Sequence, residues 1–431
     1  MEEVKDGHES LFGDGVSMKF WTRAWPRATS ISKVEDLIFT RRRLSLCGYT
    51  FLAANIAAFA VHFVAGNWLI DRAGNYISTD FLQWWLGSRV ALGRGAAAVY
   101  NDSTFSAART LVTKSAPPIS YFHYVYPPTM LLLCAPLARL PYVTAFFAWL
   151  AATVGLYVLA LYAILPSVLS IVLTFVPLPV AKSVYEGQTS FLMVGLLGLS
   201  LLFMSRRPYL SGMCLGLLTY KPQFVLFFPL ALVITGQWRV VAGATGSASL
   251  FAAATTMVFG PNAWLLFLRS SQGANPATFL PPNMDALNQT VLGMMHAAGA
   301  GLVGAWIVHL AVALSATVLA CRIWLQAPVP HSLKAAAFSI GVLIMTPYML
   351  AYDLTALSVP AIFLVADALE HGFVPGERLV LLSCCLALFL CFNFTVGPIV
   401  LVALMGLVVR RVRYVTNGRA HTDISELRPP V

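Results

Sequence analysis

Charge is scarce in this chain of 431 residues: only 11% are charged, whereas 58% are hydrophobic. The few charges separate long apolar runs, and a helix needs about 20 mainly apolar residues to cross a bilayer. Residues 44–70, 142–165, 240–260 and 301–325 each reach that length. The runs are continuous, without the polar–apolar alternation of barrel strands. They exclude a soluble core and predict an all-α polytopic membrane protein.

Several recognisable sites are also missing. The seven cysteines all fall inside apolar runs, where they are typical of small hydrophobic residues, and no Cys/His spacing resembles a zinc site. The chain has no phosphate-binding G-x-x-x-x-G-K-[ST] loop, and its predicted outer segments contain no Asp-x-Asp. We therefore expect neither a metal ion nor another cofactor, and no nucleotide-sugar held by a metal.

The net charge of +10 does not indicate nucleic acid, because the basic residues sit at the ends of the apolar runs, where Lys and Arg mark the cytoplasmic side. Residues 1–43 are polar, and no cleavable signal peptide is evident, so the first run is expected to be a retained span. No internal repeat is visible, which argues weakly against a transporter built from two related halves.

The arginines indicate the topology. They precede the first apolar run at 41–43 and follow the last at 410, 411 and 413, so both termini are expected in the cytoplasm and the number of spans is even. We predict about twelve spans, at residues 44–70, 127–139, 142–165, 188–204, 208–220, 222–237, 240–260, 300–325, 335–349, 352–369, 379–394 and 396–409. This topology makes Arg139 cytoplasmic. The remaining apolar run, residues 167–181, would break the parity, so we interpret it as a re-entrant or half-membrane segment.

Three regions follow from this interpretation. Residues 1–43 form a partly flexible cytoplasmic segment, residues 44–410 a single multi-span membrane domain, and residues 411–431 a cytoplasmic tail.

Unusual polar residues gather on the predicted outer side. Asp80 opens a Trp-rich stretch, residues 80–93, which is typical of a helix lying in the membrane interface. The other candidates on this side are His123, Tyr126, Glu186, Gln188, Lys221, Asn288 and Asp353, with Arg89 inside the Trp-rich stretch.

Each candidate also has a structural interpretation. Asp80 can be a solvated carboxylate or a helix cap, Glu186 and Gln188 can cap a helix, and His123 can be an ordinary interfacial histidine. Asp353 can be paired with a neighbouring Tyr or Asn. Lys221 can extend its ammonium to the outer interface, although an outward lysine runs against the usual charge bias.

Together these residue types suggest one chemistry. A carboxylate at the outer interface can accept a proton from a hydroxyl nucleophile, and a lysine can neutralise a phosphate leaving group as a compact point charge. An aromatic-rich interfacial helix can bind a lipid or a sugar. The combination fits transfer of a group from a lipid phosphate to an alcohol.

The ordered motifs resemble glycosyltransferase family 87, the polyprenyl-phosphate-sugar-dependent membrane mannosyltransferases. The motifs are Asp80-Phe81 with Trp84-Trp85, Ala91-Leu92-x-Gly, Val99-Tyr100, Tyr126-Pro127-Pro128, Gly187-Gln188, Lys221-Pro222 and Asn288 before a span. The similarity runs from about residue 44 to residue 410. In this chain Thr189-Ser190 follows Gln188, where many relatives have a Val/Ile/Thr-Asn pair.

The resemblance implies a class C glycosyltransferase fold, an inverting displacement and a donor of the polyprenyl-phosphate-mannose type. It implies that Asp80 is the general base. Lys221, and more weakly Arg89, are the candidates for the donor phosphate. Tyr126, Glu186, Gln188 and Asn288 are expected to line the sugar or acceptor pocket, to which we add Asp353 and His123.

The expected partners are membrane lipids, the lipid-linked sugar donor and a glycolipid or glycan acceptor, and the expected location is the plasma (inner) membrane with the active site outside. Two other functions stay open. A transporter or flippase of a lipid-linked sugar needs polar groups along a path through the spans, and few are present on the inner half. A non-catalytic protein of cell-envelope assembly would tolerate loss of Asp80.

Overall fold

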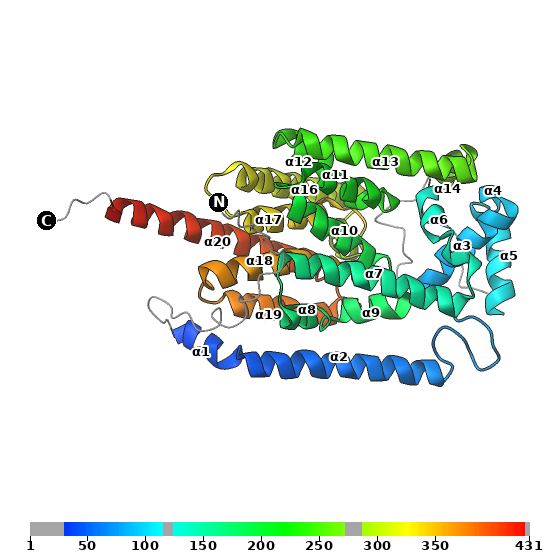
Figure 1. The fold of residues 1–431 in the computed structure, drawn as a ribbon, viewed down its shortest axis with the longest axis horizontal. Helices are drawn as coiled ribbons and strands as arrows, with labels where there is room; N and C mark the ends of the chain where they lie inside the picture. The colour runs from blue at the N-terminus through cyan, green and yellow to red at the C-terminus, as the bar shows by residue number, and fades with distance from the viewer. Residues whose placement is uncertain (1–29, 115–123, 272–286, 427–431) are drawn as a thin grey trace, which may run out of the picture.

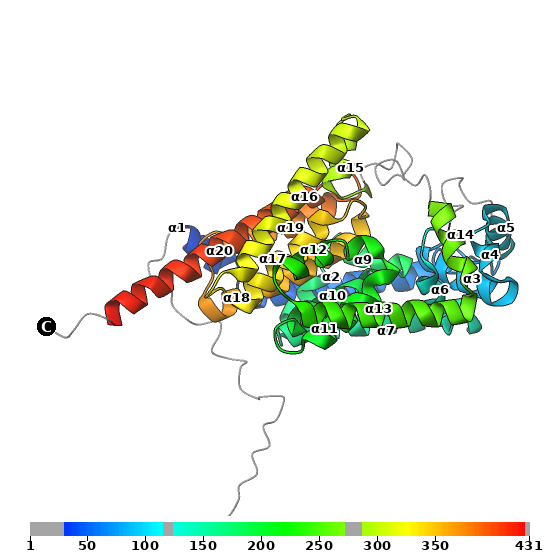
Figure 2. The ribbon, with the colours of Figure 1, turned by 90° about the horizontal axis from the view of Figure 1, so that it is seen from above.

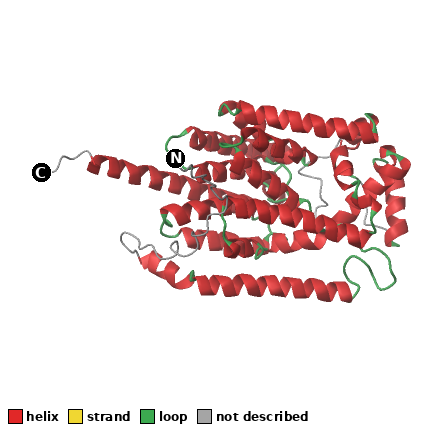
Figure 3. Ribbon diagram, viewed as in Figure 1, coloured by secondary structure: helices red, strands yellow, loops and turns green. Residues whose placement is uncertain are grey.

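The computed structural model describes residues 30–114, 124–271 and 287–426. Within these ranges every named secondary-structure element is a helix, and extended pairing occurs only as isolated bridges such as Ile70 with Tyr76. Most of the long helices run side by side along the long axis of the molecule (Figures 1 and 3). The predicted all-α class is confirmed.

Among the described residues, five helices are long and apolar enough to cross a bilayer, and all five correspond to predicted spans. They are α2 (Arg41–Val64), α7 (Tyr142–Ile164), α13 (Trp238–Phe259), α16 (Leu302–Leu325) and the stretch Ala351–His371, which joins the 3-10 helix η6 (Ala351–Leu357) to α18 (Ser358–His371). Viewed from above, α16 slants across the direction of α13 (Figure 2).

Shorter apolar helices lie between the long ones. They are α10 (Ser190–Phe203), α11 (Pro208–Leu217), α12 (Phe227–Ile234), α17 (His331–Met345) and α19 (Glu377–Ala387), with the 3-10 helices η3 (Leu218–Tyr220), η4 (Pro222–Phe224) and η7 (Leu388–Leu390). These α-helices have 8 to 15 residues and are therefore about 12–23 Å long, shorter than a hydrocarbon core of about 30 Å. The total of twelve spans therefore stays a prediction.

One end of the molecule, which we call the α3 end, is built from short helices (Figure 1). They are α3 (Asp80–Arg94), α4 (Ala96–Val99), α5 (Asp102–Thr113), α6 (Pro128–Cys134), η2 (Leu137–Arg139) and α14 (Asn262–Ser271). The helix α15 (Val291–Ala297) precedes α16. The Trp-rich stretch predicted to form a helix is α3, and its aromatic residues Phe81, Trp84 and Trp85 are buried within the protein.

The predicted span at residues 127–139 is wrong. This segment forms α6 and η2, and a seven-residue helix is about 10 Å long, a third of the hydrocarbon thickness. Both pieces pack on α3: Ser88 Oγ donates to the Leu131 carbonyl at 3.1 Å, and Trp85 Nε1 donates to the Leu140 carbonyl at 3.2 Å. Arg139 therefore lies at the α3 end, away from the start of α2 and the arginines at 41–43, with which it was predicted to share a side.

The apolar run at 167–181 is broken by a sharp bend, which fits either a broken span or the predicted re-entrant segment. It forms α8 (Val168–Thr174) and part of α9 (Leu178–Glu186), which are bent by 75° to each other. The run follows the far end of α7, whereas Glu186 contacts Asp80 at the α3 end, where α7 begins.

The opposite end, which we call the α1 end, is held by buried ion pairs. It contains α1 (Ser30–Ile38), the start of α19 and the later turns of α20 (Gly397–Glu426). Arg411 is fully buried and contacts both Asp367 and Glu377, at 2.5 and 2.6 Å. Glu35 accepts hydrogen bonds from the backbone N–H groups of residues 376, 378 and 379. Because α20 continues through residue 411 to Glu426, the predicted start of a separate tail at 411 falls inside a helix.

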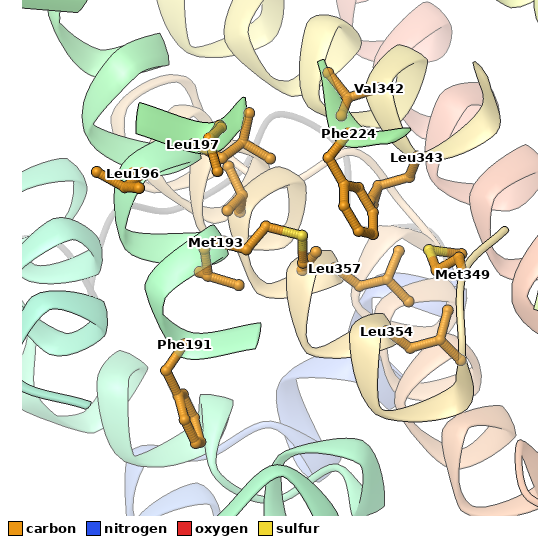
Figure 4. Close-up of a cluster of buried hydrophobic side chains, with 14 of the residues drawn as sticks. Phe191, Met193, Leu196, Leu197, Phe224, Val342, Leu343, Met349, Leu354 and Leu357 are labelled. Atoms are coloured by element: carbon orange, nitrogen blue, oxygen red, sulfur yellow. The ribbon is translucent and has the colours of Figure 1, made fainter. Parts of the chain in front are cut away.

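Small residues allow α11 and α13 to pack closely. A Cβ built at Gly212 would lie 2.2 Å from the Val240 carbonyl, and one at Gly216 would lie 2.4 Å from the Ala244 carbonyl. Glycines four residues apart on one helix face let two backbones approach closely in lipid. The apolar core between α10, η4 and η6 holds Met193, Phe224 and Leu357, which point toward one another (Figure 4).

Candidate active site

Asp80 is the first residue of α3, and the residue before it fixes its position. The Thr79 hydroxyl accepts a hydrogen bond from the Leu82 N–H at 3.3 Å and lies 2.8 Å from the Tyr142 hydroxyl at the start of α7. Thr79 is thus a helix N-cap that also ties α3 to α7. Backbone N–H groups at a helix N-terminus favour a carboxylate at this position.

The end of α9 brings two polar side chains to Asp80. The helix ends at Glu186, and Gly187 follows in the left-handed conformation with φ of 65°. A Cβ there would lie 2.6 Å from the Phe146 ring, so both the conformation and the space require glycine. Glu186 Oε2 accepts from the Asp80 N–H at 3.2 Å, and Gln188 Nε2 donates to Asp80 Oδ2.

Lys182 lies one turn before Glu186 on α9. Its Nζ is 2.7 Å from Glu186 Oε1, and the two side chains are 40% and 16% exposed. Each carboxylate oxygen of Glu186 therefore has a partner, Lys182 on one side and the backbone of Asp80 on the other. We did not single out Lys182 from the sequence, although a Lys–Glu pair four residues apart on a helix is a usable signal.

A second, buried ion pair lies deeper in the protein. Lys221 Nζ is 2.7 Å from Asp353 Oδ1, and each side chain is only 3% exposed. Asp353 Oδ1 also accepts from the Ser190 hydroxyl at 3.0 Å, and its Oδ2 accepts from the Leu350 N–H at 3.3 Å. These additional hydrogen bonds offset part of the cost of removing two charges from water.

Three consecutive residues connect the two acidic groups. Gln188 binds Asp80, the Thr189 carbonyl accepts from the Tyr220 hydroxyl at 3.1 Å, and Ser190 binds Asp353. Ser190 occupies a position where relatives are expected to carry Asn. A small hydroxyl there still binds the deeper carboxylate.

Two tyrosines lie near both carboxylates. Burial raises the pKa of the Tyr126 hydroxyl well above its usual range, and the charges of Asp353 and Asp80 raise this pKa further. Tyr352 interacts electrostatically with the same two carboxylates, and its ring centre is 5.9 Å from Lys221 Nζ. Asp80, Asp353 and Lys221 thus form one site with an aromatic wall.

The surroundings of Asp80 raise its pKa to about 7. Burial is the largest cause, because it disfavours the ionised form, and the nearby charge of Glu186 acts in the same direction. Lys182, Arg109 and Lys221 lower the pKa by smaller amounts. A carboxyl group whose pKa lies near neutrality can exchange a proton at physiological pH, as a general base must.

The other predicted residues are placed as follows. Arg89 donates to the Ala138 carbonyl at 3.2 Å and stacks over Trp85, about 14 Å along α3 from Asp80. Asn288 is buried, pairs through its backbone with Leu350 and accepts from Thr290, so it lies close to the loop that leads to Asp353. His123 lies outside the described residues.

Two apolar cavities flank α9. One, of about 200 Å³, reaches Pro177 just before α9, Val180 on α9, and Leu354 and Thr355 on η6. The other, of about 320 Å³, lies between α2, α7 and α9 and also reaches Val180. Within the described ranges, no group of three or more His, Cys, Asp or Glu side chains is arranged to hold a metal ion.

The model of one family, described as glycosyltransferase family 87, matches residues 124–351. That segment contains Tyr126, Lys182, Glu186, Gln188, Lys221 and Asn288. Asp80 precedes it and Asp353 follows it, so the structure connects both residues to the matched segment. No curated protein and no solved structure matches the chain.

Proposed function

The chain belongs to glycosyltransferase family 87, and from this premise we propose that it moves a hexose, most simply mannose, from a polyprenyl-phosphate donor to a hydroxyl group of a lipid or glycan. Its family and its apolar helices make it a membrane glycosyltransferase. The proposal adds the donor, the sugar, a class C glycosyltransferase fold and an active site on the extracytoplasmic face of the plasma membrane.

Asp80 is the proposed general base. Gln188 holds its Oδ2 oxygen, which leaves Oδ1 to accept the proton of the acceptor hydroxyl. As this proton moves to Asp80, the hydroxyl oxygen forms a bond to the anomeric carbon of the sugar. The bond from that carbon to the phosphate oxygen breaks on the opposite face, so the configuration inverts. The position of Asp80 at the start of α3, held by Gln188 and Glu186, is the observation that carries this assignment, and its pKa near 7 supports it.

The polyprenyl phosphate leaves as an anion and needs no general acid, unlike the alcohol released by a glycosidase. Lys221 is the proposed phosphate ligand. An ammonium group has three donors, and Asp353 accepts one of them at 2.7 Å, so the other two can reach a phosphate in the site. Arg89 is the weaker choice, because it contacts Ala138 and Trp85 far along α3.

The sugar and the acceptor are proposed to lie between Asp80 and Asp353. Tyr126 supplies an aromatic face there, and Gln188, Asp353 and Asn288 supply polar groups on the surrounding walls. Both oxygens of Glu186 are already engaged, which favours a role toward Asp80 over direct contact with sugar. His123 is kept as a pocket candidate from the sequence alone.

Two features support a lipid-linked donor and an outward-facing site. Apolar cavities flank α9, the helix that carries Glu186 to Asp80, and they suit an isoprenoid chain better than a polar substrate. The arginines at positions 41–43 begin α2 at the end of the molecule opposite to α3 (Figure 1). If these arginines face the cytoplasm, the α3 end faces outward.

The deciding experiment is a transfer assay with the full-length protein in membranes. The donor is polyprenyl-phosphate-mannose labelled in the sugar, the acceptor is native lipid extract, and wild type is compared with Asp80→Asn at equal amounts of folded protein. We expect a labelled product with wild type only, with at least a 100-fold loss in the variant, in line with the size of general-base catalysis.

Equal transfer by both proteins would remove Asp80 as the base. Transfer by neither would contradict mannose as the sugar, and the same assay with other lipid-linked sugars would then test the donor class. Movement of labelled donor across sealed vesicles that is insensitive to Asp80→Asn would instead indicate a transporter.

A further inference from the structure

We propose that Lys182 and Glu186 form a positioning pair that acts on Asp80, with Glu186 holding the first turn of α3 and supplying a negative charge that Lys182 partly compensates. This inference rests on the proposed function of Asp80 as the base. It assigns neither residue to direct contact with the substrate.

Lys182, Glu186 and Asp80 form a chain of contacts that runs from the protein surface to the base. The Lys182 ammonium is 2.7 Å from Glu186 Oε1, and Glu186 Oε2 accepts a hydrogen bond from the Asp80 N–H at 3.2 Å. Lys182 and Glu186 sit one turn apart at the end of α9, so a single rigid helix presents both groups to α3. The exposed fraction falls from 40% at Lys182 to 16% at Glu186.

The same geometry explains why the pair controls the proton affinity of Asp80. A second carboxylate next to Asp80 disfavours its ionisation, whereas a nearby ammonium favours it. The groups that face Asp80 from its neighbouring elements are Glu186 and Lys182 on α9, Arg109 on α5, Lys221 between η3 and η4, Tyr126 before α6 and Tyr352 on η6. Glu186 is the one acidic group among those that shift Asp80, and it opposes three cations.

The two members of the pair are therefore expected to act in opposite directions. Without the charge of Glu186, Asp80 ionises more easily and its pKa falls. Without Lys182, the charge of Glu186 is no longer compensated and the pKa of Asp80 rises. A purely structural role for the two residues predicts no such opposition.

The test measures kcat/KM for sugar transfer between pH 5 and 9 with the full-length protein in membranes. The rise of activity with pH should move down by about one unit in Glu186→Gln and up by about one unit in Lys182→Gln. Lys182→Arg keeps the charge and should restore the wild-type profile. Lys114→Gln removes an exposed lysine at the end of α5 and should leave the profile unchanged.

Profiles that do not move, or that move in the same direction in both variants, would overturn the inference. A higher KM for the donor in Lys182→Gln with an unmoved profile would also overturn it, because Lys182 would then bind substrate directly. Lys182 is partly exposed, so its variant decides the question even if Glu186→Gln does not fold. Failure of the proposed function is seen separately, as an active Asp80→Asn.

Discussion

The side-chain amide of Gln188 donates a hydrogen bond to a carboxylate oxygen of Asp80, a residue 108 positions earlier in the chain. This bond joins α3 to the turn that follows α9, and that turn also delivers Ser190 to Asp353. The orientation of Asp80 is thus set by a segment that continues directly to the second acidic group of the site.

Replacing Gln188 should therefore impair catalysis more than substrate binding. In Gln188→Leu the Asp80 carboxylate loses the donor that orients it, and a displacement of about 1 Å at a reacting group can cost on the order of 100-fold in rate. We expect kcat to fall by about that factor while KM for the donor changes little. Steady-state kinetics measure both.

Gln83→Leu is the matched control, because Gln83 is also on α3 and is only partly buried. Its kcat should stay near the wild-type value. A Gln188→Leu enzyme with normal kcat would show that the hydrogen bond does not orient the base.

The pH dependence of transfer should follow ionisation of Asp80. The base must be charged to accept a proton, and its pKa is about 7, so kcat/KM should rise about tenfold per pH unit below pH 7 and level off above it. A plateau that extends down to pH 5 would contradict this assignment.

The raised pKa of Asp80 also predicts the direction in which the stability of the folded protein changes with pH. Between its ordinary value of 3.8 and about 7, the folded protein binds a proton that the unfolded chain has released. Stability therefore decreases as pH rises through this window. Asp80→Asn removes the effect, so thermal unfolding in membranes or detergent should favour the variant over wild type more strongly at pH 8 than at pH 5.

Variants of the Lys221–Asp353 pair should distinguish its contribution to folding from a role in phosphate binding. Lys221→Met leaves Asp353 charged and buried without its partner, and we expect a loss of about 3–5 kcal/mol in the free energy of unfolding. The double variant Lys221→Met with Asp353→Asn removes both charges and should recover most of that loss, as read from thermal unfolding.

Transfer activity of this double variant, compared with that of Asp353→Asn alone, then gives the role of Lys221. If Lys221 binds the donor phosphate, the double variant is stable but poorly active, with a higher KM for the donor or a lower kcat. Wild-type transfer in the double variant would reduce the pair to a structural role.

The α11–α13 contact should tolerate no added methyl group at Gly216. A Cβ at this position would meet the Ala244 carbonyl at 2.4 Å, and backbone cannot move aside cheaply. Gly216→Ala should lose about 2 kcal/mol or more and lower the yield of folded protein. Gly246→Ala on α13 is the control, since a Cβ there has no atom within 4 Å, and it should fold as well as wild type.

Hydropathy alone was sufficient to predict the long spans. The apolar runs that became α2, α7, α13 and α16 have the length that a bilayer demands, and their boundaries agree within three residues except at the end of α2, which lies six residues before the predicted one. It failed at residues 127–139, because an apolar run of about a dozen residues satisfies either a membrane crossing or burial against other helices. Only contacts in three dimensions, such as the hydrogen bond from Ser88 to Leu131, distinguish the two.

The sequence by itself determined that this chain is a helical membrane protein and which family it belongs to. The length of the apolar runs, the scarcity of charge and the short ordered motifs are local properties of the chain, so they can be recognised without a structure. The tertiary structure alone decided how the candidate residues combine. It paired Lys221 with Asp353, it brought Lys182 into the surroundings of Asp80, and it separated Arg89 from the site. Charge pairing and proton affinity depend on distance and burial in three dimensions, and linear spacing carries neither.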